Sequence, residues 1–156
     1  FSTWRGGFSR MNSFKAFAVI ALLVLASGCA SVPMASKEDD AAAKTFSVPS
    51  DKSRIYVYRN EFIGGAVKIP ITLDGRLVGS TVKNTYFALD TTPGSHDVGC
   101  IGETPGSVKV DLKAGEVAYI WQEMKMGMWA ASCAMHVANT EEAQKAIAGC
   151  TLAVSQ

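Results

Sequence analysis

The segment from residue 124 to 136 holds the side chains with the greatest capacity for chemistry, because sulfur atoms and an imidazole gather there. Its candidate metal ligands are Met124, Met126, Met128, Cys133 and His136. Thioether and thiolate sulfur are soft ligands that suit Cu(I), so one hypothesis is a periplasmic Cu(I) or thiol module. On a strand, however, residues three apart face opposite ways, which weakens a site shared by Cys133 and His136.

The same segment has two interpretations without a metal. In a strand, the methionines at every second position lie on one face, with Trp121, Glu123 and Trp129 on the other. Because methionine fills irregular gaps, the first interpretation is a core strand. The second is an exposed Met/Trp patch that binds a partner or a lipid. Our main prediction is that the chain holds no metal and no cofactor.

Three cysteines in the second half of the chain are candidates for a disulfide: Cys100, Cys133 and Cys150. An odd number leaves one thiol over after a single intramolecular bond. The pairing of Cys133 with Cys150 is slightly favoured, since a strand and the segment after a C-terminal helix can meet at one end of a sandwich. Pairing of Cys100 with either of the others stays open.

Ser95, His96 and Asp97 are the residue types of a hydrolase triad, but consecutive strand residues point to opposite faces and cannot form one. His136 is the other histidine, and neither has a carboxylate at a sequence spacing that would orient it. We therefore predict no catalytic residue and no enzyme activity. A formal net charge of +1, without a block of like charges, also argues against a nucleic-acid partner.

The elements that would position these side chains follow an export signal. Lys15 precedes an apolar run of 11 residues, 16–26, which is too short for a membrane-spanning helix and typical of a signal peptide. Residues 25–29, Leu-Ala-Ser-Gly-Cys, resemble the lipobox of bacterial lipoproteins, which implies a lipid on Cys29. Residues 11–28 are then the signal peptide, and residues 1–10 an upstream artefact or tag.

The lipobox resemblance also implies a location. Several acyl chains on Cys29 would hold the protein at a membrane far more firmly than one chain. Lipoproteins of this type whose second mature residue is not aspartate usually reach the outer membrane, and here that residue is Ala30. We expect a lipid-anchored envelope protein that faces the periplasm, with the membrane as one partner and an envelope protein or peptidoglycan as a candidate second.

After the lipidated cysteine the chain divides into two parts. Residues 29–50 show no sustained apolar period and predict a flexible tether, in which a helix through the alanines at 41–43 would be marginal alone. Residues 51–156 predict one β-sandwich domain, because apolar and polar residues alternate and turn signals recur about every eight to twelve residues.

Several elements of this domain can be placed. Residues 54–59 and 117–123 are apolar on both sides, which is typical of central strands. Pro70 predicts an edge strand or a bulge, and Asp74-Gly75 a two-residue hairpin turn. A helix between Asn139 and Gly149 is expected against one end of the sheet. The fold class is mainly all-β: a single antiparallel β-sandwich with one short C-terminal helix.

The pattern of strands and turns resembles a known family, the small bacterial lipoproteins with domain of unknown function 2846, and more loosely the PEGA-type β-repeats. The residues that carry the resemblance are Ile55-Tyr56-Val57-Tyr58-Arg59, Gly64-Gly65-Ala66, Leu73-Asp74-Gly75, Val78-Gly79, Tyr86-Phe87 and Pro93-Gly94-Ser95-His96. The resemblance covers roughly residues 54–153 and implies a β-domain without an established activity. Together these observations favour a non-catalytic envelope lipoprotein.

Overall fold

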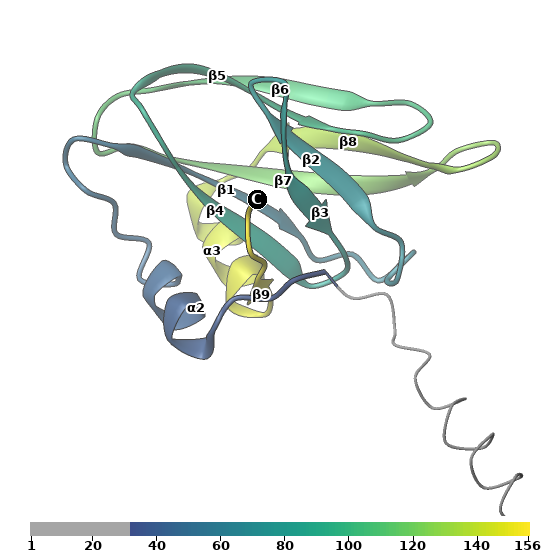
Figure 1. The fold of residues 1–156 in the computed structure, drawn as a ribbon, viewed down its shortest axis with the longest axis horizontal. Helices are drawn as coiled ribbons and strands as arrows, with labels where there is room; N and C mark the ends of the chain where they lie inside the picture. The colour runs from purple at the N-terminus through teal and green to yellow at the C-terminus, as the bar shows by residue number, and fades with distance from the viewer. Residues whose placement is uncertain (1–31) are drawn as a thin grey trace, which may run out of the picture. The chain divides into compact units, whose positions relative to one another are not determined.

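The computed structural model describes residues 32–156, and this part of the chain forms nine strands and two helices (Figure 1). In chain order these elements are α2 (Lys37–Ala43), β1 (Ser53–Arg59), β2 (Ile69–Leu73), β3 (Arg76–Thr81), β4 (Thr85–Thr91), β5 (Gly94–Cys100), β6 (Gly106–Leu112), β7 (Val117–Met126), β8 (Ala131–Val137), α3 (Thr140–Ala148) and β9 (Thr151–Leu152). The predicted β fold with a short C-terminal helix is confirmed. The predicted signal peptide and Cys29 lie outside the described residues.

Five strands form a mixed sheet in the order β8-β7-β1-β4-β9. β1 is central and β7 is its neighbour, as the apolar character of both predicts. The two run parallel, with Tyr56 opposite Tyr119, and β4 pairs with β9 in parallel too. The expectation of a purely antiparallel sandwich is therefore wrong for this sheet, because the connection from β1 to β7 crosses through the other sheet.

The second sheet is antiparallel, with the order β3-β2-β5-β6. The predicted turn between β2 and β3 is present, and both Asp74 (φ 51°) and Gly75 (φ 79°) adopt the left-handed conformation that it requires. β2 is an interior strand, so of the two alternatives predicted from Pro70 the edge strand is wrong and the bulge is confirmed, by the register shift between Ile71 and Thr72. The missing N–H is tolerated because the ladder to β5 begins only at Ile71, and the β2–β3 register shifts at that residue.

The two sheets pack face to face around an apolar core to which both contribute (Figure 1). Alternation sets which side chains face inward: Ile55 and Val57 of β1 point into the core, whereas Tyr56 and Tyr58 point to the opposite face. The core residues with almost no exposure include Ile55, Val57, Ile69, Ile71, Phe87, Val98 and Ile120.

Both helices lie against the outer face of the five-stranded sheet (Figure 1). Tyrosines of β1, β4 and β7 cover this face beneath them. Asn139 caps α3 by accepting hydrogen bonds from the N–H groups of Glu141 and Glu142, as predicted. Ala143 and Ile147 of α3 then pack on the tyrosines of this face. The helix thus lies on the sheet face rather than against one end of the sheet.

The predicted tether over residues 29–50 is wrong for its described part, which folds onto the sandwich. Val32 is buried in the core, and Met34 forms a β-bridge with Ala153. Within α2, the Asp40 carboxylate accepts hydrogen bonds from the Leu152 N–H (2.8 Å) and the Tyr86 hydroxyl (3.0 Å). These contacts stabilise a helix that would be marginal in isolation.

Candidate functional site

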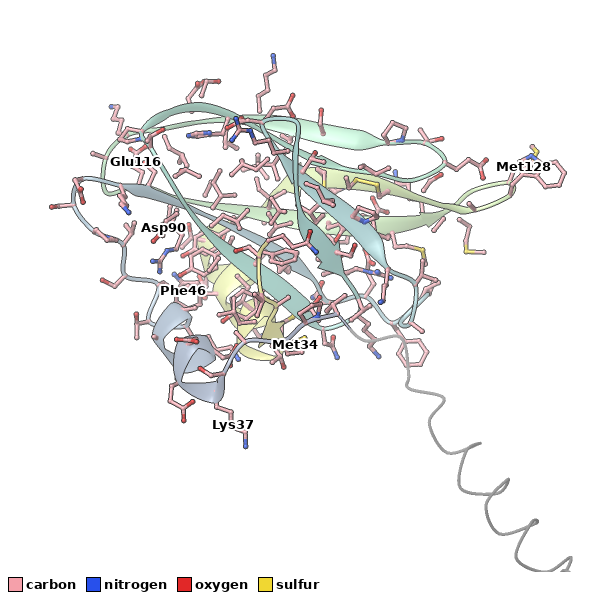
Figure 2. All side chains as sticks on the ribbon, in the orientation of Figure 1. Met34, Lys37, Phe46, Asp90, Glu116 and Met128 are labelled. Carbon is pink, nitrogen blue, oxygen red and sulfur yellow. A yellow bond between two sulfur atoms is a disulfide. The ribbon has the colours of Figure 1, made fainter. Side chains whose placement is uncertain are left out.

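The hairpin of β7 and β8 ends in a tip of exposed apolar side chains. The exposed fractions are 82% for Met126, 81% for Met128 and 89% for Trp129. Figure 2 shows Met128 at the outer end of this hairpin. Met124, by contrast, packs against the core. The tip therefore fits the interpretation as an exposed Met/Trp patch, and the base of the hairpin fits the interpretation as a core strand.

The loop between β1 and β2 adds two more exposed apolar side chains. Phe62 is 85% exposed and Ile63 is 65% exposed. A groove of about 520 Å³ lies between this loop and the hairpin, and most of its lining is apolar. Its lining includes Ile63, Val67, Met124, Met126, Met128 and Trp129. We call Phe62, Ile63, Met126, Met128 and Trp129 the tip patch.

Glu103, in the turn between β5 and β6, holds the tip in shape. Its carboxylate accepts hydrogen bonds from the backbone N–H groups of Met128 (3.0 Å), Trp129 (2.7 Å) and Ala130 (2.6 Å). These bonds hold the pKa of Glu103 below its usual value. Gly127 permits the tight turn, because a Cβ there would lie 2.1 Å from the Ala130 carbonyl oxygen. The tip is thus an ordered loop with its apolar side chains outward.

Arg59 holds the loop between β1 and β2 in shape, as Glu103 does for the hairpin tip. This arginine is fully buried, and its guanidinium donates to the carbonyl oxygens of Gly64 and Val67, both at 2.7 Å. Its Nε lies 3.5 Å from the Glu61 carboxylate, which also accepts a hydrogen bond from the Met124 N–H (2.8 Å). One buried ion pair therefore connects the loop to the hairpin strand.

The base of the hairpin is joined to the other sheet by a disulfide between Cys100 and Cys133. Cys100 ends β5 and Cys133 lies in β8, so the bond links the two sheets. The favoured pairing of Cys133 with Cys150 is therefore wrong, and the open alternative with Cys100 is correct. The turn after β5 lies directly along β8, since the Glu103 N–H donates to the Ala131 carbonyl oxygen (2.9 Å).

The five candidate Cu(I) ligands do not all meet in one site. Cys133 is in the disulfide and offers no thiolate. Met124 lies opposite Cys133 on the inner face, whereas His136 lies opposite Trp121 and stacks on its ring on the outer face. Residues 32–156 also contain no cluster of three or more His, Cys, Asp or Glu side chains suited to a metal. A Cu(I) site that uses all five of these residues is thus contradicted by this geometry, whereas Met124, Met126 and Met128 line the same groove.

Both histidines have carboxylate partners, contrary to the prediction from sequence spacing. His136 Nε2 lies 2.8 Å from Glu123, on the neighbouring strand. His96 Nδ1 lies 2.7 Å from Asp74, and its Nε2 lies 2.7 Å from the Thr92 carbonyl oxygen. The Asp74 carboxylate also accepts the Asp97 N–H (2.8 Å), so this pair fastens the β2–β3 turn to β5. Both pairs form across strands, which a sequence distance does not reveal.

The pair of His96 and Asp74 predicts a pH dependence of stability. The hydrogen bonds to Asp74 and Thr92 raise the pKa of His96 above 6.5, and His96 lowers the pKa of Asp74 below 3.8. The histidine's contribution is therefore complete below about pH 6.5 and is lost as the pH rises through the folded-state pKa. The aspartate's contribution is lost as the pH falls through its own lowered pKa. Since Asp74 is exposed, we expect the pair to contribute less than about 1 kcal/mol to the free energy of unfolding.

Denaturant unfolding at about pH 5.5 and about pH 9 measures this contribution. The wild-type chain should lose more stability on going to the higher pH than His96→Gln, which cannot become charged. A second variant, Asp74→Asn, removes the charge of the partner carboxylate and should likewise reduce the wild-type difference. Equal pH profiles for wild type and His96→Gln would contradict the assignment.

Cys150 is the free cysteine of the described part of the chain, and it is buried under α3. Burial raises the pKa of its thiol to about 11. Its Sγ lies 3.4 Å from the Ala146 carbonyl oxygen. This thiol has the character of a packing group, and nothing around it favours reactivity.

Three contributors to the candidate site were missed by the sequence reasoning: the exposed pair Phe62-Ile63, Glu103 and Arg59. Two adjacent large apolar residues beside Gly64-Gly65, in a loop rather than a strand, were a readable signal. Glu103 carries no local signal, because its closest partner at the tip is 25 residues away. Arg59 reads as an ordinary strand end, and only the fold shows that it faces inward.

Comparisons with known proteins add a family and a relative. The family described as "Protein of unknown function (DUF2846)" matches residues 49–134, a range that includes both the loop and the hairpin tip. An uncharacterized protein of Haemophilus influenzae is 30% identical over 151 residues, which is 96% of this chain and 90% of that protein. No solved structure matches the chain significantly. Among the helices that the structure describes, none is long and apolar enough to cross a bilayer.

Proposed function

This chain belongs to the family described as "Protein of unknown function (DUF2846)", and from that premise we propose that it is a lipid-anchored protein of the bacterial cell envelope. In this proposal, the β-sandwich is a non-catalytic binding or structural module that presents the tip patch to another envelope component. The lipid is carried by Cys29, and the protein faces the periplasm from the outer membrane.

The observation that carries the anchor is the contiguous pattern before Cys29. An apolar run of 11 residues at 16–26 is followed by small residues and then the cysteine. This order is the one in which a signal segment and an acylation site occur in bacterial lipoproteins. Ala30 in the next position favours the outer membrane as the destination.

The binding role is supported by the tip patch and by the state of the histidines. Large apolar side chains that are held outward by Glu103 and Arg59 favour recognition of an apolar surface. The imidazoles of His96 and His136 each contact a carboxylate, and their hydrogen-bond partners include neither a hydroxyl nor a thiol nucleophile. This arrangement favours a structural role for both histidines over acid–base catalysis.

The substitution Cys29→Ser tests the anchor. We expect it to abolish both acylation and cleavage, because serine lacks the sulfur that forms the thioether. Mass spectrometry of protein extracted from membranes, together with labelling by a radioactive fatty acid, measures both events. Cys150→Ser is the matched control and should leave acylation unchanged, since that thiol is buried. A Cys29→Ser chain that is trimmed normally and stays with the same membranes would overturn the proposal.

A further inference from the structure

The distance between the proposed anchor and the folded body is short. Val32 is already buried in the core, with 4% of its surface exposed. Cys29 is therefore three residues from the sandwich, and an extended chain spans at most about 3.3–3.6 Å per residue. A lipid on Cys29 would hold the sandwich within about 10–11 Å of the bilayer surface. A long tether over residues 29–50 would have allowed the domain to lie farther from the bilayer, but residues 32–50 fold onto the domain instead.

The tip patch has the composition of a membrane-interface contact. Trp129 combines a large apolar ring with a polar N–H, and tryptophan is enriched at the level of lipid headgroups. Met126, Met128 and Phe62 add flexible and aromatic apolar surface, each more than 80% exposed. Met128 lies at the outer end of a projecting hairpin (Figure 2). A projecting apolar tip suits insertion into a planar bilayer better than it suits the surface of a second folded protein.

The charges around the patch also fit a phospholipid surface. The ammonium group of Lys83 lies 4.3 Å from the centre of the Phe62 ring. Lys125 is half exposed, and its Nζ lies 3.5 Å from the Glu123 carboxylate. Lysines beside apolar side chains can reach headgroup phosphates while the apolar groups insert. The acidic group at the tip itself, Glu103, already accepts three backbone N–H groups, and this lessens its repulsion from phosphate.

We infer that the tip patch is a second membrane contact, in which Trp129, Met128 and Phe62 insert into the interfacial layer of the same bilayer that holds the lipid on Cys29. This inference rests on the proposed function. It names the envelope component that the patch recognises as the lipid surface itself. The ordered tip and the short reach from Cys29 would together fix the orientation of the sandwich on the membrane.

Tryptophan fluorescence of the lipidated chain tests this contact. The lipidated chain, which begins at Cys29, contains Trp121 and Trp129, so the variant Trp121→Phe leaves Trp129 as the reporter. The variant is purified from membranes and reconstituted into vesicles of phosphatidylethanolamine and phosphatidylglycerol, with and without brominated acyl chains. We expect Trp129 emission to shift to shorter wavelength, to lose most of its intensity to the brominated lipid, and to become protected from a water-soluble quencher.

The control variant Trp129→Phe leaves Trp121 as the reporter. Trp121 stacks on His136 at the outer sheet face, away from the tip, and should not be quenched by brominated lipid. Leu77→Ser, which alters an exposed leucine near the β2–β3 turn, should leave the Trp129 signal unchanged when added to the first variant.

Two results would overturn the inference. The first is water-like Trp129 emission in chains that remain bound to vesicles through their lipid. The second is Trp129 emission at shorter wavelength in vesicles that brominated lipid does not quench, which would indicate a protein partner or a second copy. Failure of the proposed function is distinct, because an unlipidated chain would be recognised by its mass before any fluorescence is measured.

Discussion

Replacing Arg59 with methionine should lower the free energy of unfolding by about 3 kcal/mol, because the change leaves the partly buried Glu61 carboxylate without its cation. Burial raises the pKa of Glu61, and both the Met124 N–H and the Arg59 guanidinium act against this rise by favouring the charged carboxylate. The carbonyl groups of Gly64 and Val67 would lose their donors as well. Denaturant unfolding of the two chains under identical conditions measures the difference.

Two further variants identify the cause of that loss. The double variant Arg59→Met/Glu61→Gln should be more stable than Arg59→Met alone, since no unpaired charge remains inside. Arg54→Met removes another arginine of β1, whose partner Asp90 is exposed, and should change stability by about 1 kcal/mol or less. If Arg59→Met unfolded at the wild-type denaturant concentration, the buried pair would not be what holds the loop.

Removing the disulfide should produce a loss of similar size. The bond between Cys100 and Cys133 spans a sequence separation of 33 residues, and a closed loop of that length restricts the unfolded chain by about 3–4 kcal/mol. We expect Cys100→Ala/Cys133→Ala, or reduction of the wild-type chain, to lower the free energy of unfolding by this amount. Guanidinium unfolding with and without a phosphine reductant provides the measurement.

The third cysteine supplies the control. Cys150→Ala should keep the full difference between oxidised and reduced chains, because its thiol takes no part in the bond. The alanine double variant should show no response to reductant at all. A reductant response that disappears in Cys150→Ala would instead favour the pairing of Cys133 with Cys150.

Most individual strands were predictable because their signals are local. Apolar residues on both sides identified β1 and β7 as central strands. Asp74-Gly75 identified the turn after β2, since that turn needs two residues in the left-handed region. The Asn139 cap and Gly149 marked both ends of α3. Each of these features depends on neighbours within about four residues along the chain, so the sequence order carries the information directly.

The order of strands and the docking of α2 were not predictable in this way. The parallel pairing of β1 with β7 joins segments that are far apart in sequence. The hydrogen bond from the Leu152 N–H to the Asp40 carboxylate bridges 112 residues, and it converts an expected tether into part of the domain. A short helix with little apolar surface carries no sign of such a partner, because its stability comes from packing rather than from its own propensity.

For the candidate site, the sequence alone determined the residue types: the sulfur and tryptophan side chains of residues 124–136, and the lipobox-like residues 25–29 on which the proposed anchor rests. Only the tertiary structure decided their use. It placed Cys133 against Cys100, turned His136 to the opposite face from Met124, and set Met128 and Trp129 outward on a loop held by Glu103. The chemistry of a side chain is fixed by its residue type, and the sequence shows it directly. A site, however, needs side chains that are far apart in the sequence to lie close together. Only the packing of the two sheets brings such residues together.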